Sequence, residues 1–138
     1  MNFTLAKFFN KWQETAPKIK NFIIEFWSHL YAKIYSVVLL ITILANWLMA
    51  FYIDYHIKDS QIALHYNVDF GIDYYGNINQ IYIIPVLGVL IAFFNLIILI
   101  ISYQHKDRHI IAHILLSAAE IVNIILLIAL VSLYLINS

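Results

Sequence analysis

The segment Ile81–Ser102 reads IYIIPVLGVLIAFFNLIILIIS and carries no charged side chain. Two further apolar segments, Ile34–Ile53 and Ile114–Ile136, have a similar length, and Glu120 is the one charged residue among the three. A helix of about 20 apolar residues matches the roughly 30 Å hydrocarbon core of a bilayer. A soluble domain of 138 residues could not bury three such helices. The sequence therefore predicts an all-α membrane protein with three transmembrane helices.

The composition indicates the same class of protein. Hydrophobic residues make up 63% of the chain and charged residues 12%, against about 45–50% and 25% in soluble domains. The chain has no cysteine, which excludes disulfides, thiolate catalysis and cysteine-ligated metals. The sequence contains neither a catalytic set of side chains nor a nucleotide-binding motif. We therefore expect no enzymatic activity, no cofactor and no nucleic-acid partner.

The basic residues are distributed unevenly around the three segments. Only Lys58 lies in the loop 54–80. The other seven lie near the opposite ends of the segments: Lys7, Lys11, Lys18, Lys20, Lys33, Lys106 and Arg108. Because basic residues accumulate in cytoplasmic loops, this side is predicted to be cytoplasmic. The N-terminus is then cytoplasmic, the loop 54–80 and the C-terminus lie outside, and the lipid bilayer is the first expected partner.

Residues 1–33 are predicted to form amphipathic helices at the cytoplasmic interface, ahead of a membrane domain at 34–138. Between Ala16 and Lys33 apolar residues recur every three to four positions, with Thr15 as a suitable N-cap. A shorter helix that includes Trp12 is expected upstream. A basic amphipathic helix with Trp and Phe can lie in the lipid interface, attracted by anionic lipid. The alternative is a docking face for another protein or for a second copy of this chain.

The outer loop contains His65-Tyr66-Asn67-x-x-Phe70-Gly71-Ile72-Asp73, which leads to Ile84-Pro85-x-x-Gly88. This pattern resembles small uncharacterised multi-pass membrane proteins of candidate-phyla bacteria. Over about Trp47–Asn95 the chain is also distantly similar to the N-terminal domain of SdpI-type immunity proteins. The resemblance implies a bacterial plasma membrane and a structured outer loop. The chain lacks the proline usually found before the loop histidine and the further membrane domain of immunity proteins, so no chemistry is implied.

Four polar residues of this loop are candidates for recognising a ligand or partner: His65, Asn67, Asp69 and Asp73. Their β-branched and aromatic neighbours, together with the turn former Gly71, predict a short hairpin or extended element. His and Asp can ligate a divalent metal, but Gly71 argues against a helix that would align them. A solvated loop with local Asp and Asn turns is the simpler interpretation, and no metal is assigned.

Glu120 is the most informative residue within the predicted spans. A carboxyl group in a bilayer shares hydrogen bonds, stays protonated or faces water. Other polar residues are expected on its helix face or at a similar depth: Asn123, Ser117, His113, Asn95, Thr42 and Asn46. One interpretation is a proton or cation path from His113 through Ser117 to Glu120. The other is a set of interhelical hydrogen bonds, from Glu120 and Asn123 to Asn95 or Asn46, or to another copy of the chain.

Three histidines, His105, His109 and His113, recur every four residues. A turn between residues 102 and 110 must join two spans, so His105 is expected outside the helix. His109 and His113 then have the spacing of a zinc-binding pair. Interfacial histidines near lipid phosphates are the simpler interpretation, and no metal is predicted here either.

Three functions stay open. The first is a non-enzymatic interaction or assembly subunit that binds other membrane proteins or forms a homo-oligomer. The second is an oligomeric transport component that moves protons, ions or small solutes with Glu120. The third is an immunity- or receptor-like protein that uses the outer loop.

The predicted orientation can be tested by cysteine labelling, because the chain has no cysteine. The variants Ser60→Cys and Asn77→Cys should react with a membrane-impermeant maleimide in intact cells. The variant Lys106→Cys should react only after lysis. Reversed labelling would contradict the orientation, which depends on the distribution of basic residues.

Overall fold

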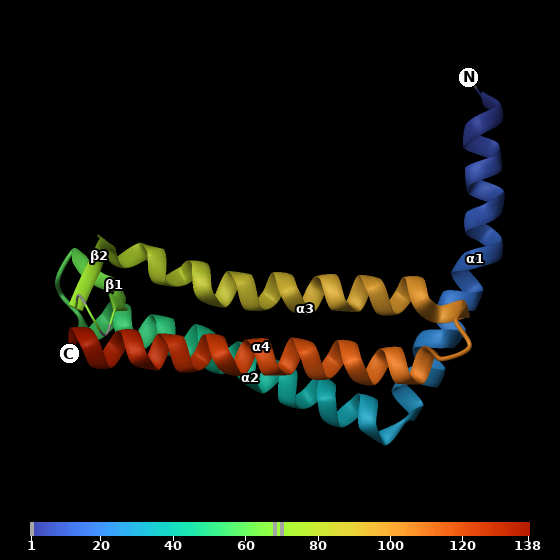
Figure 1. Cartoon of the computed structure of the whole chain (residues 1–138). Coiled ribbons are helices and arrows are strands. Elements are labelled where there is room, and N and C mark those ends of the chain that lie inside the picture. Colours follow the sequence, from blue (N-terminus) through green and yellow to red (C-terminus); the bar gives the residue numbers. More distant parts are fainter. Residues whose placement is uncertain (1, 68, 70) are drawn as a thin grey trace.

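The computed structural model describes residues 2–67, 69 and 71–138, without the side chains of residues 2–6, 8, 11, 65–67 and 73. Its elements are α1 (Asn2–Ser28), α2 (Leu30–His56), β1 (Gln61–Asn67), β2 (Gly71–Asn77), η1 (Ile78–Tyr82), α3 (Ile83–Ile101), η2 (Ser102–Gln104) and α4 (Arg108–Asn137). The helices α2, α3 and α4 form a bundle with the β1–β2 hairpin at one end and α1 at the other (Figure 1). We call these the hairpin end and the basic end, since the second carries Lys33, Lys106 and Arg108.

Three helices are long and apolar enough to cross a membrane: Leu30–His56, Ile78–Gln104 and Arg108–Asn137. They contain the predicted segments 34–53, 81–102 and 114–136, which confirms the prediction of a mostly helical chain with three possible spans. The helices α2 and α4 extend beyond their apolar segments, whereas α3 lies within 81–102 and is continued by η1 and η2. The helix α4 packs along both other spans, whereas α2 and α3 separate toward the basic end (Figure 1).

The bundle is closed by a hydrophobic cluster at each end. At the hairpin end the cluster consists of Ala50, Ile53, Ile57, Ile62, Ile81 and Leu130. At the basic end it consists of Phe22, Phe26, Ala32, Leu99, Ala112 and Leu116. The first cluster joins β1 and η1 to the spans, and the second joins α1 to them. The clusters leave the middle of the bundle to the polar side chains described below.

The helix α1 differs from the predicted arrangement of two shorter helices. A single helix runs from Asn2 to Ser28 with Pro17 inside it. The chain bends at His29, whose backbone is extended (φ −77°, ψ 133°), so the helix predicted to reach Lys33 ends earlier. Figure 1 shows α1 crossing the basic end instead of continuing the line of α2. Burial of Phe22 and Phe26 against α3 and α4 holds the bend, which no Gly or Pro marks in the sequence.

The loop 54–80 contains an antiparallel hairpin. Its strands pair from Gln61 with Asn77 to Asn67 with Gly71. Gly71 begins β2 with φ +77°, a left-handed conformation that favours glycine. Asn137, at the end of α4, fastens the hairpin to the bundle. Its side-chain N–H donates to the Ala63 carbonyl at 2.9 Å, and its side-chain oxygen accepts from the Ala63 N–H at 2.8 Å.

Candidate functional site

Four polar side chains meet in the middle of the bundle: Thr42 and Asn46 of α2, and Glu120 and Asn123 of α4. We call them the polar core. The two residues on α2 are four positions apart and the two on α4 three apart, so each pair shares a helix face. Asn46 and Asn123 are fully buried and Glu120 is 9% exposed. Because lipid cannot satisfy such groups, they face the interior of the bundle.

The two asparagines connect all three spans. The Asn46 side-chain nitrogen donates to the Asn123 backbone carbonyl at 3.1 Å and to the Asn123 side-chain oxygen at 3.5 Å. The Asn123 side-chain nitrogen in turn donates to the Gly88 carbonyl of α3 at 3.4 Å. Each amide also bonds a carbonyl one turn back on its own helix, Thr42 for Asn46 and Ala119 for Asn123. These bonds fix the relative positions of α2, α3 and α4 along the bundle.

Gly88 permits this contact because it has no side chain. A Cβ atom at position 88 would lie 2.4 Å from the Asn123 side-chain oxygen, closer than atoms can pack. Small residues allow close approach of helices in membranes, and Gly88 serves the same purpose for a backbone-to-amide contact. Gly88 was not predicted to belong to this site. A glycine within an uninterrupted apolar helix is the signal in the sequence that could have indicated a close contact between helices at this position.

Glu120 has a single partner among the described residues. The Thr42 hydroxyl lies 3.3 Å from Glu120 Oε2 and donates to it, while also lying 3.0 Å from the Leu39 carbonyl. Glu120 Oε1 and the Asn46 side-chain oxygen are buried without a hydrogen-bond donor in the described part of the chain. A protonated carboxyl group can donate one hydrogen bond, whereas a carboxylate can only accept. The polar core therefore has two acceptor atoms, Glu120 Oε1 and the Asn46 side-chain oxygen, that could each take a further hydrogen bond.

The other polar residues that were expected near Glu120, namely Asn95, Ser117 and His113, lie elsewhere. Asn95 does not meet Glu120 or Asn123; its side chain donates to Ile91 O of its own helix at 2.9 Å. Ser117 donates to the Tyr35 hydroxyl at 3.0 Å. His113 is exposed, and its ring stacks on Tyr31 with centroids 4.1 Å apart. Ser117 and His113 thus belong to a layer between the polar core and the basic end.

Asn95 lines an apolar groove between α2 and α3, on the side where they separate. The groove has a volume of about 520 Å³, with its basic end bounded by Phe22 and Trp27 of α1. Ala92 and Leu96 of α3 line it together with Ala119 of α4. Asn95 and Ser36 are its polar lining residues. We call it the α2–α3 groove.

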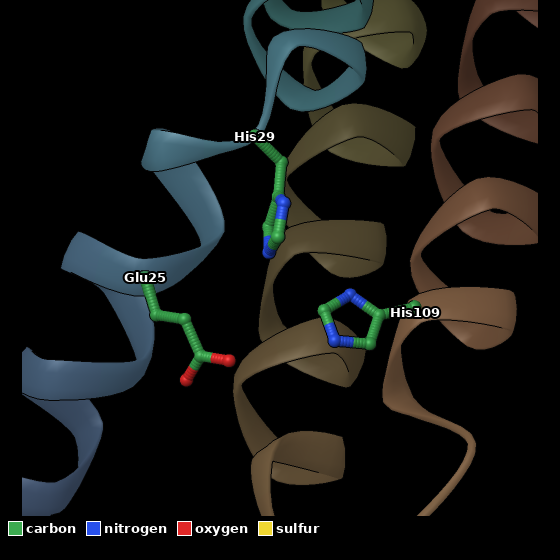
Figure 2. Close-up of side chains that lie close together, drawn as sticks. All are labelled: Glu25, His29 and His109. Carbon is green, nitrogen blue, oxygen red and sulfur yellow. The ribbon is translucent and has the colours of Figure 1, made fainter.

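A second group of side chains with possible metal-ligand atoms lies at the basic end. Glu25 of α1, His29 at the bend and His109 of α4 point toward a common space (Figure 2), and one ligand atom from each lies within 4.8 Å of the others. Sequence spacing paired His109 with His113 and did not point to Glu25 or His29. Their spacing of four residues was a local signal, but the approach of His109 depends on the bend at His29. His105 lies outside this group, and its Nδ1 is 3.8 Å from Asp107 Oδ2.

The outer-loop candidates lie in the hairpin and its connecting turn. The backbones of His65 and Asn67 belong to β1 and that of Asp73 to β2, while Asp69 lies in the connecting turn and is exposed. The side chains of His65, Asn67 and Asp73 lie outside the described part of the chain. Their predicted role in recognition stays a prediction.

Comparison with protein-family models, curated proteins and solved structures found no match to this chain.

The contact between the two buried asparagines can be measured with a double-mutant cycle. The variants Asn46→Ala and Asn123→Ala should each destabilise the bundle, and the double variant should lose less than their sum. We expect a coupling free energy of about 0.6–1.7 kcal/mol, the range of interhelical hydrogen bonds in membranes. The free energy of unfolding would be measured in bilayers or mild detergent.

A matched cycle between Asn123→Ala and Ser132→Ala serves as the control, since Ser132 is exposed and bonds only Ile128 O of its own helix. That pair should show no coupling. Additive effects at Asn46 and Asn123 would show that their hydrogen bond does not hold α2 against α4.

Proposed function

We propose that this protein is a non-enzymatic assembly subunit of the bacterial plasma membrane that binds a transmembrane helix of another protein in its α2–α3 groove. The observation that carries the proposal is the separation of α2 from α3, which leaves an apolar groove of about 520 Å³ beside α4. A fourth helix placed there would complete a four-helix bundle. Such bundles pack helices around a shared core, and three helices leave part of that core uncovered.

The side chains of the groove suit a helix better than a lipid tail. Ala92 and Ala119 are small, and small residues allow helices to approach closely within a bilayer. The Asn95 side chain uses one N–H for Ile91 O, which leaves its other N–H and its oxygen for a partner. An acyl chain offers no hydrogen bond to this amide, whereas a polar side chain on a partner helix does.

A different protein fits the groove better than a second copy of this chain. Asn46, Glu120 and Asn123 are buried within their own bundle, so a second copy could not reach their side chains. The exposed residues Ile121, Ile125 and Ile128 of α4 are apolar and offer no polar partner for Asn95. We therefore propose a heteromeric complex. Self-association would be a different result of the experiment below.

The N-terminal helix supports placement of the basic end at the cytoplasmic surface. In this proposal α1 lies in the lipid interface, because it crosses the ends of the spans instead of running along them (Figure 1). Trp12 and Trp27 are more than half exposed, and Lys18 and Lys20 are exposed on the same helix. Exposed tryptophans with lysines favour an interface rich in anionic lipid. The buried Phe22 and Phe26 dock the helix onto its own bundle.

The two other functions have weaker support. A transport component would use the buried Glu120, with its one unpartnered oxygen in the described structure. Tyr31, Tyr35, His113 and Ser117 extend from the basic end toward it, but no hydrogen bond among the described residues joins Ser117 to Glu120. An immunity- or receptor-like role would depend on loop side chains outside the described part. The assembly function is therefore preferred.

The proposal can be tested with a photo-crosslinking amino acid at Leu96, which lines the groove, and at Ile125, on the exposed face of α4. In membranes of the native host, position 96 should crosslink to one membrane protein through a transmembrane peptide, and position 125 should not. The variant Ala92→Trp, which fills the groove, should abolish the crosslink at 96. The control variant Ile128→Trp should leave it unchanged.

Mass spectrometry of the crosslinked peptides identifies the occupant. Crosslinks from position 96 to lipid alone, or to a second copy of this chain, would contradict the heteromeric proposal. Identical products from positions 96 and 125 would show that the groove has no specific occupant.

A further inference from the structure

We propose that Glu25, His29 and His109 bind a divalent transition metal, with Zn²⁺ as the best-matched ion, and that the metal fastens α1 to α4 at the basic end. The three residues come from α1, from the bend between α1 and α2, and from the first turn of α4. Figure 2 shows their side chains converging from these separate segments. The site is independent of what occupies the α2–α3 groove.

The donor set selects the class of metal. Two imidazoles and one carboxylate suit zinc and other late transition metals. Mg²⁺ and Ca²⁺ prefer oxygen ligands throughout, so they fit poorly. Three protein ligands leave one position of a tetrahedral zinc ion for water or a partner's side chain.

The distances are close to those that zinc requires. Zinc–nitrogen bonds of about 2.0–2.1 Å place the ligand atoms of a tetrahedral site about 3.3 Å apart. The three ligand atoms here lie within 4.8 Å of one another. Glu25 is exposed, so a rotation of its side chain that keeps the Arg108 contact can shorten the remaining distance.

His109 has one ring nitrogen already engaged. Its Nδ1 lies 3.0 Å from the Tyr31 hydroxyl, a hydrogen bond whose donor depends on the tautomer. With the proton on Nδ1, the ring donates to Tyr31 and Nε2 keeps a free lone pair. Metal-bound histidines are commonly held in this way, by a second residue that fixes the tautomer and orients the ring.

His29 has a buried nitrogen with no use in the fold itself. Its Nε2 is buried without a hydrogen-bond partner in the described part of the chain. It occupies the N-cap position of α2, yet its side chain makes no capping hydrogen bond. The ring stacks against Tyr31 at 5.5 Å and meets His109 edge to face at 5.0 Å. A metal ion would satisfy this nitrogen.

Glu25 is held in place by Arg108. The guanidinium contacts Glu25 Oε1 at 2.5 Å, which draws the carboxylate toward α4 and leaves the second oxygen for the metal. Carboxylate ligands are often hydrogen-bonded by a neighbouring residue in this manner. The positive charge of Arg108 repels a metal cation. The affinity for the metal therefore depends more on the two histidines than on electrostatic attraction.

The test uses full-length protein without a histidine tag, purified in mild detergent and titrated with Zn²⁺ in competition with a chromophoric chelator. Wild-type protein should bind one Zn²⁺ per chain, and excess Mg²⁺ should not compete. His29→Ala and His109→Ala should each weaken binding on the order of tenfold or more, since loss of an orienting residue alone costs about 10–100-fold. Tyr31→Phe should weaken it less than either ligand variant.

Matched controls are His56→Ala and His105→Ala, which remove exposed histidines outside the site and should leave the affinity unchanged. Hydrogen exchange gives a second readout on the wild-type protein: Zn²⁺ should slow exchange of the backbone amides at 25–30. The absence of stoichiometric binding would overturn the proposal. So would an equal loss in His105→Ala and His109→Ala, or binding that leaves exchange at 25–30 unchanged.

Discussion

The hydrogen bonds between Asn46, Asn123 and the Gly88 carbonyl are the contact on which the rest of this bundle depends. Within a bilayer, helices gain no hydrophobic free energy by leaving lipid for one another, so van der Waals packing and polar contacts decide how they associate. The outer surfaces of the three spans are almost entirely apolar and specify no register. The buried side-chain amides of Asn46 and Asn123, which meet α3 at Gly88, do specify the register.

The arrangement at both ends follows from this register. With α4 in contact with both neighbours, α2 and α3 meet near the hairpin and separate toward the basic end, which opens the α2–α3 groove. The same register brings His109 beside the bend at His29, where α1 turns across the bundle. The α2–α3 groove and the cluster of Glu25, His29 and His109 are therefore both positioned by α4. A change in the polar core would alter both.

The three possible spans were predictable from the sequence, because length and hydropathy alone define a segment that can cross a bilayer. The polar side chains of the core, Thr42, Asn46, Glu120 and Asn123, also stood out, since such residues are rare in apolar helices. The place of Asn95 was not predictable. It has the same depth as Glu120 by residue count, but the rotation of α3 turns it into the groove, and rotation depends on packing. The role of Gly88 was not predictable either, because it depends on the missing side chain, which lets Asn123 of α4 reach the Gly88 carbonyl.

The bend at His29 and the cluster around it were beyond local sequence signals. Neither Gly nor Pro marks the end of α1, and the bend is held by burial of Phe22 and Phe26 against distant helices. Glu25 and His29 form a cluster of possible ligands only together with His109 of α4, which lies more than 75 residues later in the chain. Contacts of this range cannot be inferred from spacing along one helix.

Solid-state NMR of the protein in lipid bilayers, labelled with ¹⁵N and ¹³C at asparagine, tests the central contact most directly. Asn46→Gln and Asn123→Gln samples would assign the signals. We predict a through-space correlation between the Asn46 side-chain nitrogen and the Asn123 backbone carbonyl carbon, whose oxygen lies 3.1 Å from that nitrogen. We also predict slow exchange of the Asn46 side-chain amide protons with water. No correlation, together with fast exchange, would contradict a hydrogen bond between Asn46 and Asn123.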